Sequence, residues 1–116
     1  MDNLSRQIPI FPLSGALLLP EGNLPLNIFE PRYIAMINYA LKHHKLIGMI
    51  QPKPNDSKEL FKIGCVGQIT DFSETEDKRY IINLKGLLKF KIKNEIKHDK
   101  KFRLFNVEYE GTKSNF

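Results

Sequence analysis

The chain has 116 residues, enough to bury a hydrophobic core without disulfides or metals, and its 41% hydrophobic and 27% charged residues are typical of a globular protein. No stretch approaches the roughly 18 apolar residues of a membrane-spanning helix, and the start of the chain lacks the layout of a signal peptide. Cys65 is the one cysteine, so an internal disulfide is excluded and a cytoplasmic location is expected.

Short extended segments broken by prolines are predicted in the amino-terminal part. Residues 8–11 are expected to form an edge strand because prolines lie within and beside them. Residues 16–19 are predicted as a second strand, followed by the turn Pro20-Glu21-Gly22, with proline at its second and glycine at its fourth position. Residues 24–28 are predicted as a third strand.

One helix is predicted, from Pro31 to about residue 43. Pro31 suits the first helical position, where its missing N–H would have no intrahelical partner, and Glu30 places a carboxylate at the positive end of the helix dipole. We expect Glu30 to cap the helix and Arg32 to pair with a nearby carboxylate or carbonyl. Apolar side chains recur at three- and four-residue steps and form one stripe: Tyr33, Ile37, Ala40 and Leu41.

Longer strands are predicted further along the chain, after a strand at 46–50 and a polar loop at 51–59. Residues 61–70 alternate in polarity, and the glycines at 64 and 67 indicate a bend or bulge. An acidic hairpin loop at 74–77 leads into the next strand, whose inward-facing residues are predicted to be Tyr80, Ile82 and Leu84.

Polar and apolar residues alternate most clearly in the last part of the chain. Residues 88–96 place Phe90 on the inward side and lysines on the outward side, and residues 105–109 form the final strand. About seven or eight short strands and one helix, without strand–helix–strand alternation, predict a mainly β protein. We expect a coiled, mostly antiparallel sheet or a β-barrel.

Four motifs in order resemble the amino-terminal domain of Lon proteases. They are Ile8-Pro9-Ile10-Phe11-Pro12-Leu13, Leu24-Pro25-Leu26-Asn27-Ile28-Phe29-Glu30-Pro31-Arg32-Tyr33, Gly64-Cys65-Val66-Gly67 and Lys85-Gly86-Leu87-Leu88-Lys89-Phe90. The chain also resembles stand-alone Lon-domain proteins and the Lon-like part of cereblon. The resemblance covers about residues 7–110 and implies a PUA-like fold, with residues 1–116 forming one domain. Two departures are Asn27, where many members carry histidine, and Leu88-Lys89, where a pair of arginines is more usual.

No set of residues for catalysis accompanies these motifs. Cys65 lies among apolar residues on the inward side of a strand, which favours a buried thiol over a nucleophile. His43 and His44 are adjacent at a helix end and point apart, so they do not form a metal site. Gly64 and Gly67 lie within a strand, without the lysine and hydroxyl residue of a phosphate loop. We therefore expect no metal, no cofactor and no enzymatic activity in this chain, and the resemblance implies that catalytic centres belong to other domains.

The positive charge is concentrated in residues 85–103, which hold eight basic and two acidic side chains and account for the whole net charge of +5. Alternation places Lys89, Lys91 and Lys93 on one outward face, about 6–7 Å apart, where such a row can follow phosphates. Phe90 points to the opposite face, so the basic side lacks an aromatic platform for bases. A solvated face is favoured, and RNA binding by this segment is the alternative function.

The resemblance implies a protein-interaction domain that engages unfolded or tagged polypeptides, as part of an ATP-dependent Lon protease or as a free-standing relative. Its partners would be those substrates and the ATPase and protease domains of the same or another chain, in a homo-oligomer. Neither a membrane nor a nucleic acid is an expected partner. Exposed apolar patches usually mark interaction sites, and the candidate residues lie around the prolines near the strand–helix junction: Leu18, Pro20, Leu24, Leu26 and Ile28. Alternation assigns about half of them to the core.

Overall fold

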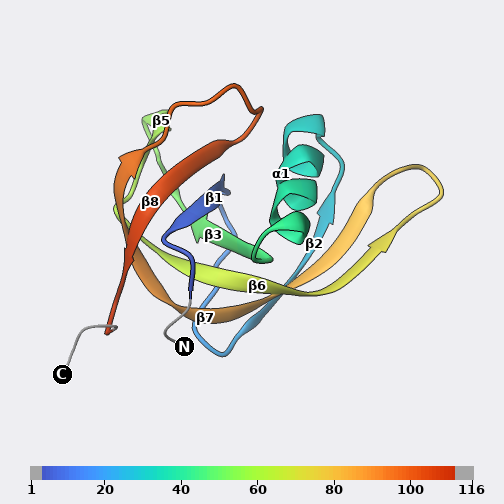
Figure 1. Ribbon diagram of the computed structural model, residues 1–116, viewed down its shortest axis with the longest axis horizontal. Helices are drawn as coiled ribbons and strands as arrows, with labels where there is room; N and C mark the ends of the chain where they lie inside the picture. The colour runs from blue at the N-terminus through green and yellow to red at the C-terminus, as the bar shows by residue number, and fades with distance from the viewer. Residues whose placement is uncertain (1–3, 112–116) are drawn as a thin grey trace.

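The structure is a computed structural model that describes residues 4–111. Its elements, in chain order, are β1 (Gln7–Pro12), β2 (Asn23–Ile28), α1 (Pro31–Lys42), β3 (Leu46–Ile50), β4 (Pro52–Lys53), β5 (Asp56–Leu60), β6 (Ile63–Glu74), β7 (Tyr80–Glu95) and β8 (Arg103–Tyr109). Six strands form one sheet in the order β2-β7-β6-β3-β1-β8, and β8 also pairs with β7, so the sheet curls into an incomplete ring (Figure 1). The predicted mainly β fold with one helix is confirmed.

Strand β7 organises the ring because it pairs with β2, β6 and β8 along its length. All pairings are antiparallel except that of β1 with β3, among the strands of residues 4–111. The β6–β7 register shifts between Val66 and Gly67 and again between Ile69 and Asp71. Such bulges increase the local twist, which lets two long strands curl. The predicted bend at Gly67 is therefore confirmed.

The core lies inside the ring and beneath α1. The helix buries Met36, Ile37 and Ala40 against one cluster of apolar side chains, to which Ile82 and Leu84 of β7 also belong. A second cluster of apolar side chains is separate from the first, and its fully buried members are Ile8, Ile10, Val66 and Phe90. Tyr80, Ile82 and Leu84 are all buried, as the alternation predicts.

The helix begins at Pro31, as predicted, and Glu30 occupies its N-cap position. The Glu30 carboxylate makes no capping hydrogen bond; instead its carbonyl oxygen accepts the N–H groups of Tyr33 and Ile34, each at 2.9 Å. Arg32 lies beside Glu30, with 3.8 Å between Nε and Oε1. Both side chains are exposed, so this pair contributes little to stability.

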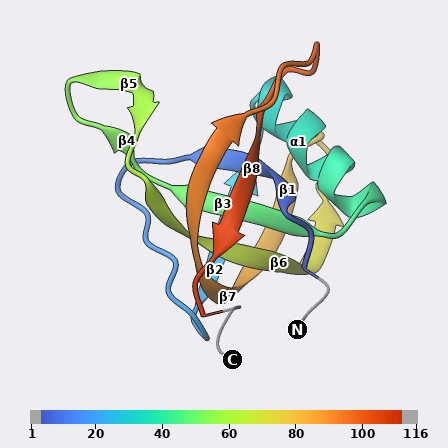
Figure 2. The same ribbon diagram turned by 60° about the vertical axis from the view of Figure 1, so that its left-hand side comes forward.

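Three local predictions are wrong. Strand β1 is not an edge strand, because it lies between β3 and β8; Pro9 is tolerated since the pairing with β3 begins only at Ile10. Residues 16–19 form a loop, not a strand. The polar segment at 51–59 contains most of the β4–β5 hairpin, which projects from the ring on the side away from α1 (Figure 2).

Candidate functional site

Residues 13–22, here called the leucine loop, connect β1 to β2 across the outside of the sheet. The loop is attached to the end of β3 at its start, where the Leu13 N–H donates to the Ile50 carbonyl at 3.1 Å. The side chain of Gln51 then donates from Nε2 to the Ala16 carbonyl at 3.2 Å. These bonds fix the first half of the loop against the sheet.

The second half of the leucine loop is fixed to β7. The Gly22 N–H donates to the Leu19 carbonyl at 2.9 Å, which confirms the predicted turn with Pro20 at its second position. Glu21 has φ 68° at the third position, where glycine is the usual residue. Its N–H donates to the Gly86 carbonyl at 2.9 Å, and the Gly86 N–H donates to the Gly22 carbonyl at 2.8 Å.

Attachment at both ends determines which leucines face solvent. Leu18 is 4% exposed and packs into the core, where a Cβ on Gly67 would lie 2.8 Å from its Cδ2 atom. Its neighbours Leu17 and Leu19 are 67% and 54% exposed. Burying the central leucine of a constrained loop leaves both neighbours in water, which costs free energy in the unbound protein.

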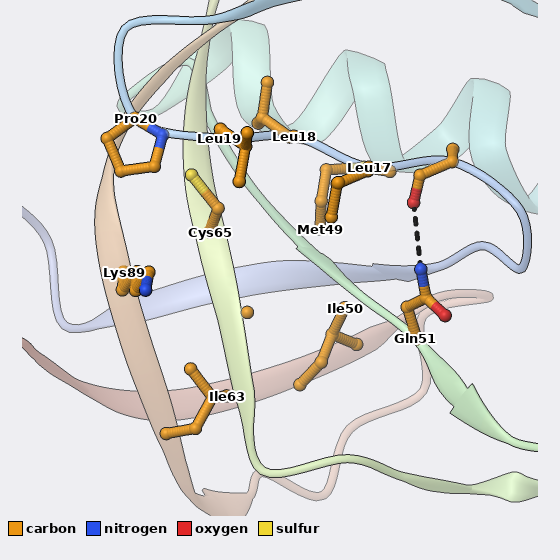
Figure 3. Close-up of a pocket in the computed structure, with 12 residues that line it drawn as sticks. Leu17, Leu18, Leu19, Pro20, Met49, Ile50, Gln51, Ile63, Cys65 and Lys89 are labelled. Atoms are coloured by element: carbon orange, nitrogen blue, oxygen red, sulfur yellow. Dashed lines mark hydrogen bonds between the residues drawn. The ribbon is translucent and has the colours of Figure 1, made fainter.

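A groove of about 260 Å³ lies between the leucine loop and the strands beneath it (Figure 3). Its lining residues are mostly apolar: Ala16, Leu17, Leu18, Leu19, Pro20, Met49, Ile50, Gln51, Ile63, Gly64, Cys65 and Lys89. Ile63, at the start of β6, is 54% exposed and extends the apolar surface. Lys89 is the one charged residue in this lining, and Figure 3 shows it on the side of the groove opposite Gln51.

The thiol in this groove is suited to packing and not to nucleophilic attack. Cys65 is 4% exposed, as predicted. Burial raises the pKa of the thiol, and the smaller opposing effects of a backbone hydrogen bond from Leu87 and the charge of Lys89 do not reverse this. Its Sγ lies 3.6 Å from the Val66 carbonyl oxygen, within reach of a weak S–H hydrogen bond. A neutral thiol of this kind behaves as a small apolar group.

A second, smaller depression of about 160 Å³ lies where β2 meets α1. Leu26 and Ile28 line it together with Phe29, which is 65% exposed, and with Tyr33. Burial raises the pKa of Tyr33, with a smaller opposing effect of Arg32. Among residues 4–111, the depression contains no set of groups arranged for acid–base chemistry.

The structure divides four of the five predicted site residues between two places. Leu18 and Pro20 line the groove, although Leu18 is a core residue. Leu26 and Ile28 line the second depression, where Ile28 is only 4% exposed, and Leu24 is partly buried against the main core.

The sequence reasoning missed the exposed apolar residues of these surfaces: Leu17, Leu19, Phe29 and Ile63. One signal could have found two of them. In an extended segment, alternation places the first and third of three consecutive leucines on one side and the second on the other, so burial of the second leaves the other two facing away from the core.

The basic strand faces outward as predicted, but it is not at an edge. Lys89, Lys91 and Lys93 are exposed on β7, which has partners on both sides, while Phe90 is 1% exposed. Several basic side chains of this segment are paired with carboxylates: Lys85 with Glu21 at 3.9 Å, Lys93 with Glu108 at 3.3 Å and Arg103 with Glu95 at 2.8 Å. The hydrogen bonds from Arg103 lower the pKa of Glu95. The free positive charge is thus smaller than the sequence count implies.

His43, at the end of α1, contacts a residue of its own helix. His43 stacks on Tyr39 with 4.0 Å between ring centroids, and its Nδ1 atom lies 2.7 Å from the Tyr39 carbonyl oxygen. Within residues 4–111 there is no cluster of three or more histidine, cysteine or acidic side chains able to hold a metal ion. That part of the chain also has no helix long and apolar enough to cross a membrane.

A family model and similar sequences indicate the same protein family. The family model described as the ATP-dependent protease La (LON) substrate-binding domain matches residues 7–115. A Lon protease of Desulfosudis oleivorans is 29% identical over 104 residues, which are 84% of this chain and 13% of the relative. Lon protease 1 of Bdellovibrio bacteriovorus is 31% identical over 91 residues, 74% of this chain and 12% of the relative. The chain thus spans only 12–13% of the length of these two relatives.

Solved structures support the fold. A Lon N-terminal domain protein from Xanthomonas campestris superposes with a TM-score of 0.74 at 22% identity, covering 89% of this chain and 59% of that structure. The N-terminal domain of a Mycobacterium avium complex Lon protease gives a TM-score of 0.72 at 12% identity, covering 89% and 54%. At these identities the likeness concerns the fold alone.

Proposed function

We propose that this chain, which belongs to the ATP-dependent protease La (LON) substrate-binding domain family, binds exposed apolar segments of polypeptide substrates in the groove beneath the leucine loop. The observation that carries the proposal is the exposure of Leu17, Leu19 and Ile63 around the apolar groove. Exposed apolar side chains that gather at a groove usually mark an interaction site. In this proposal Pro20 contacts the substrate, and Leu18 supports the loop from below.

The rigidity of the loop favours binding. Because the loop is hydrogen-bonded to Ile50, Gln51 and Gly86, it loses little conformational freedom when a ligand arrives. The ligand, an unfolded segment, must still be ordered, which opposes the gain from burying apolar surface. We expect a micromolar or weaker affinity for one segment, about −8 kcal/mol or less favourable.

In this proposal the domain itself is not an enzyme. It recognises substrates that are then transferred to ATPase and protease parts elsewhere in the same or another chain. Several copies of the domain in an oligomer would raise the effective concentration of binding sites and compensate for weak single contacts. We also propose a cytoplasmic location, supported by the single, unpaired cysteine.

An NMR titration of the isotopically labelled chain with an unfolded, aromatic-rich peptide tests the site, at low and at high salt. We expect shifts at the amides of Leu17, Leu19 and Ile63 that persist at high salt, because apolar contacts are not screened. The double variant Leu17→Ser/Leu19→Ser should lose binding. The matched control Ile81→Ser removes an exposed apolar side chain of β7 that does not line the groove, and should bind normally.

Two results would contradict the proposed site. Shifts confined to Lys89, Lys91 and Lys93 that disappear with salt would transfer the function to nucleic-acid binding. Shifts at Leu26 and Phe29, with none at the groove, would move the polypeptide site to the second depression.

A further inference from the structure

We propose that the groove prefers apolar segments with an acidic side chain close to the apolar residues, and that Lys89 determines this preference. The inference rests on the proposed function, because it assigns the chemical class of the segment that binds there.

The lining of the groove carries one positive charge. Lys89 is exposed and is the one charged residue in the lining. Within residues 4–111 no carboxylate forms an ion pair with it, whereas Lys85 and Lys93 of the same strand are paired with Glu21 and Glu108. An ammonium group beside an apolar surface attracts a carboxylate and repels a basic side chain. The groove should therefore prefer ligands with a negative charge over ligands with a positive charge.

The position of Lys89 gives the preference a direction along the groove. Lys89 is the register partner of Cys65, so it lies beside the thiol in the floor of the groove. In Figure 3 it lies on the same side of the groove as Pro20, and Gln51 lies on the opposite side, bonded to the backbone of the leucine loop. A segment whose apolar side chains contact Leu17 and Leu19 therefore continues past Lys89 on one side only. The acidic residue should be favoured on one flank of the apolar core more than on the other.

The backbone bonds of the turn favour an acidic side chain over the carboxylate at the end of a polypeptide. Capture of a terminal carboxylate generally uses free backbone N–H groups arranged as a nest. The turn at this end of the groove has N–H groups, but that of Glu21 donates to Gly86 and that of Gly22 donates to Leu19. The occupant inferred here is therefore an internal aspartate or glutamate.

One acidic residue of the chain competes with such a ligand. Glu110 directly follows β8, and its N–H donates to the Lys89 carbonyl at 3.0 Å, which places it beside Lys89 of β7. Its negative charge weakens the attraction that Lys89 exerts. Removal of this charge should therefore increase the preference for acidic segments.

Fluorescence anisotropy with labelled peptides, amidated at the carboxyl end, tests the inference at low ionic strength. The peptides share one apolar segment and carry Gln, Glu or Lys on either flank. We expect the Glu peptide to bind about threefold more tightly than the Gln peptide, and the Lys peptide more weakly, as for a solvent-exposed ion pair. The difference should be larger for one flank.

Variants separate Lys89 from the rest of the basic strand. Lys89→Gln should abolish the difference between Glu and Gln peptides while the Gln peptide still binds, and Lys89→Glu should reverse the order. Lys91→Gln, two residues along on the same face, lies outside the groove and should keep the preference. Glu110→Gln should increase it. Urea unfolding of each variant establishes that the fold is intact.

The outcomes distinguish the two hypotheses. If no peptide binds, or if Leu17→Ser/Leu19→Ser leaves binding unchanged, the proposed function fails. If peptides bind in the groove but Glu, Gln and Lys are equivalent, or if Lys89→Gln keeps the preference, only the inference fails. A peptide with a free carboxyl end that binds more tightly than the internal Glu peptide would also overturn it.

Discussion

At the scale of single residues, Phe90 shows how glycines make room for a large side chain. Its ring is 1% exposed, and Cβ atoms on Gly48 or Gly64 would lie only 2.9 and 2.8 Å from its Cζ atom. Gly48 lies on β3 and Gly64 on β6, which pair with each other, so the ring fills space that two missing side chains leave open. Phe90 belongs to the second core cluster.

Phe90→Ala should leave a cavity between these glycines and reduce the free energy of unfolding by about 3–5 kcal/mol. Lys91→Ala, one residue along and exposed, should change it by less than about 0.5 kcal/mol. Urea unfolding of the two variants measures the difference. Equal midpoints would mean that the inward and outward faces of β7 have been assigned incorrectly.

The buried hydroxyl of Tyr109 should make the free energy of unfolding decrease at alkaline pH. It is 5% exposed, its hydroxyl donates to the Ser5 carbonyl oxygen, and burial raises its pKa from 10 to about 12. Above pH 10 the unfolded chain loses the tyrosine proton while the folded chain keeps it. The free energy of unfolding should therefore fall by about 1.4 kcal/mol per pH unit between the two pKa values.

The variant Tyr109→Phe lacks this titration. The stability difference between the natural chain and the variant should be constant below pH 10 and should narrow as the pH rises toward 12. Urea midpoints at about pH 9 and about pH 11.5 measure it. A difference that stays constant across this range would show that Tyr109 titrates normally.

At the scale of elements, the leucine loop depends on a glycine in a distant strand. A Cβ on Gly86 would lie 2.0 Å from the carbonyl oxygen of Leu19, a backbone atom that cannot rotate away. The loop approaches β7 this closely because it exchanges hydrogen bonds with Gly86. The exposed positions of Leu17 and Leu19 are therefore set partly by β7.

Gly86→Ala should displace the leucine loop and reduce the free energy of unfolding by about 1–3 kcal/mol, the range for overpacked sites. Leu19→Ala removes an exposed side chain of the same loop and should change it by less than about 0.5 kcal/mol. Both variants should weaken peptide binding, but only Gly86→Ala should lower the urea midpoint. Normal stability of Gly86→Ala would contradict the close approach.

At the scale of the whole molecule, the chain is a sheet curled into an incomplete ring, with a groove beneath the leucine loop. The relatives that it matches are full Lon proteases, of which it spans 12–13%. The family to which it belongs is that of the substrate-binding domain. We propose that ATP hydrolysis and proteolysis, where they occur, belong to domains outside these 116 residues.

The chain by itself should neither hydrolyse ATP nor cleave casein, because it lacks a phosphate loop and its cysteine thiol is buried. Phosphate release and casein digestion, each compared with a buffer control, measure these activities. Turnover above the control that a point substitution within residues 1–116 abolishes would overturn the prediction.

The sequence alone determined the features that depend on local physics. Pro31 sets the start of the helix, the turn at Pro20 follows from proline and glycine positions, and alternation identifies the buried face of β7 around Phe90. The motifs with fixed prolines also indicated the family. Each of these signals lies within a few neighbouring residues, so no long-range contact is needed to interpret it.

Only the tertiary structure decided the candidate site. Residues 16–19 have the composition of a strand, yet the bond from Gln51 to Ala16 and the bonds of Glu21 and Gly22 with Gly86 hold them in a loop. The burial of Leu18 in this loop exposes Leu17 and Leu19. β1 became an interior strand because β8 returns beside it from the far end of the chain. Which leucine is buried, and which lysine lies beside the apolar groove, depends on contacts between segments far apart in sequence, and local patterns carry no information about those contacts.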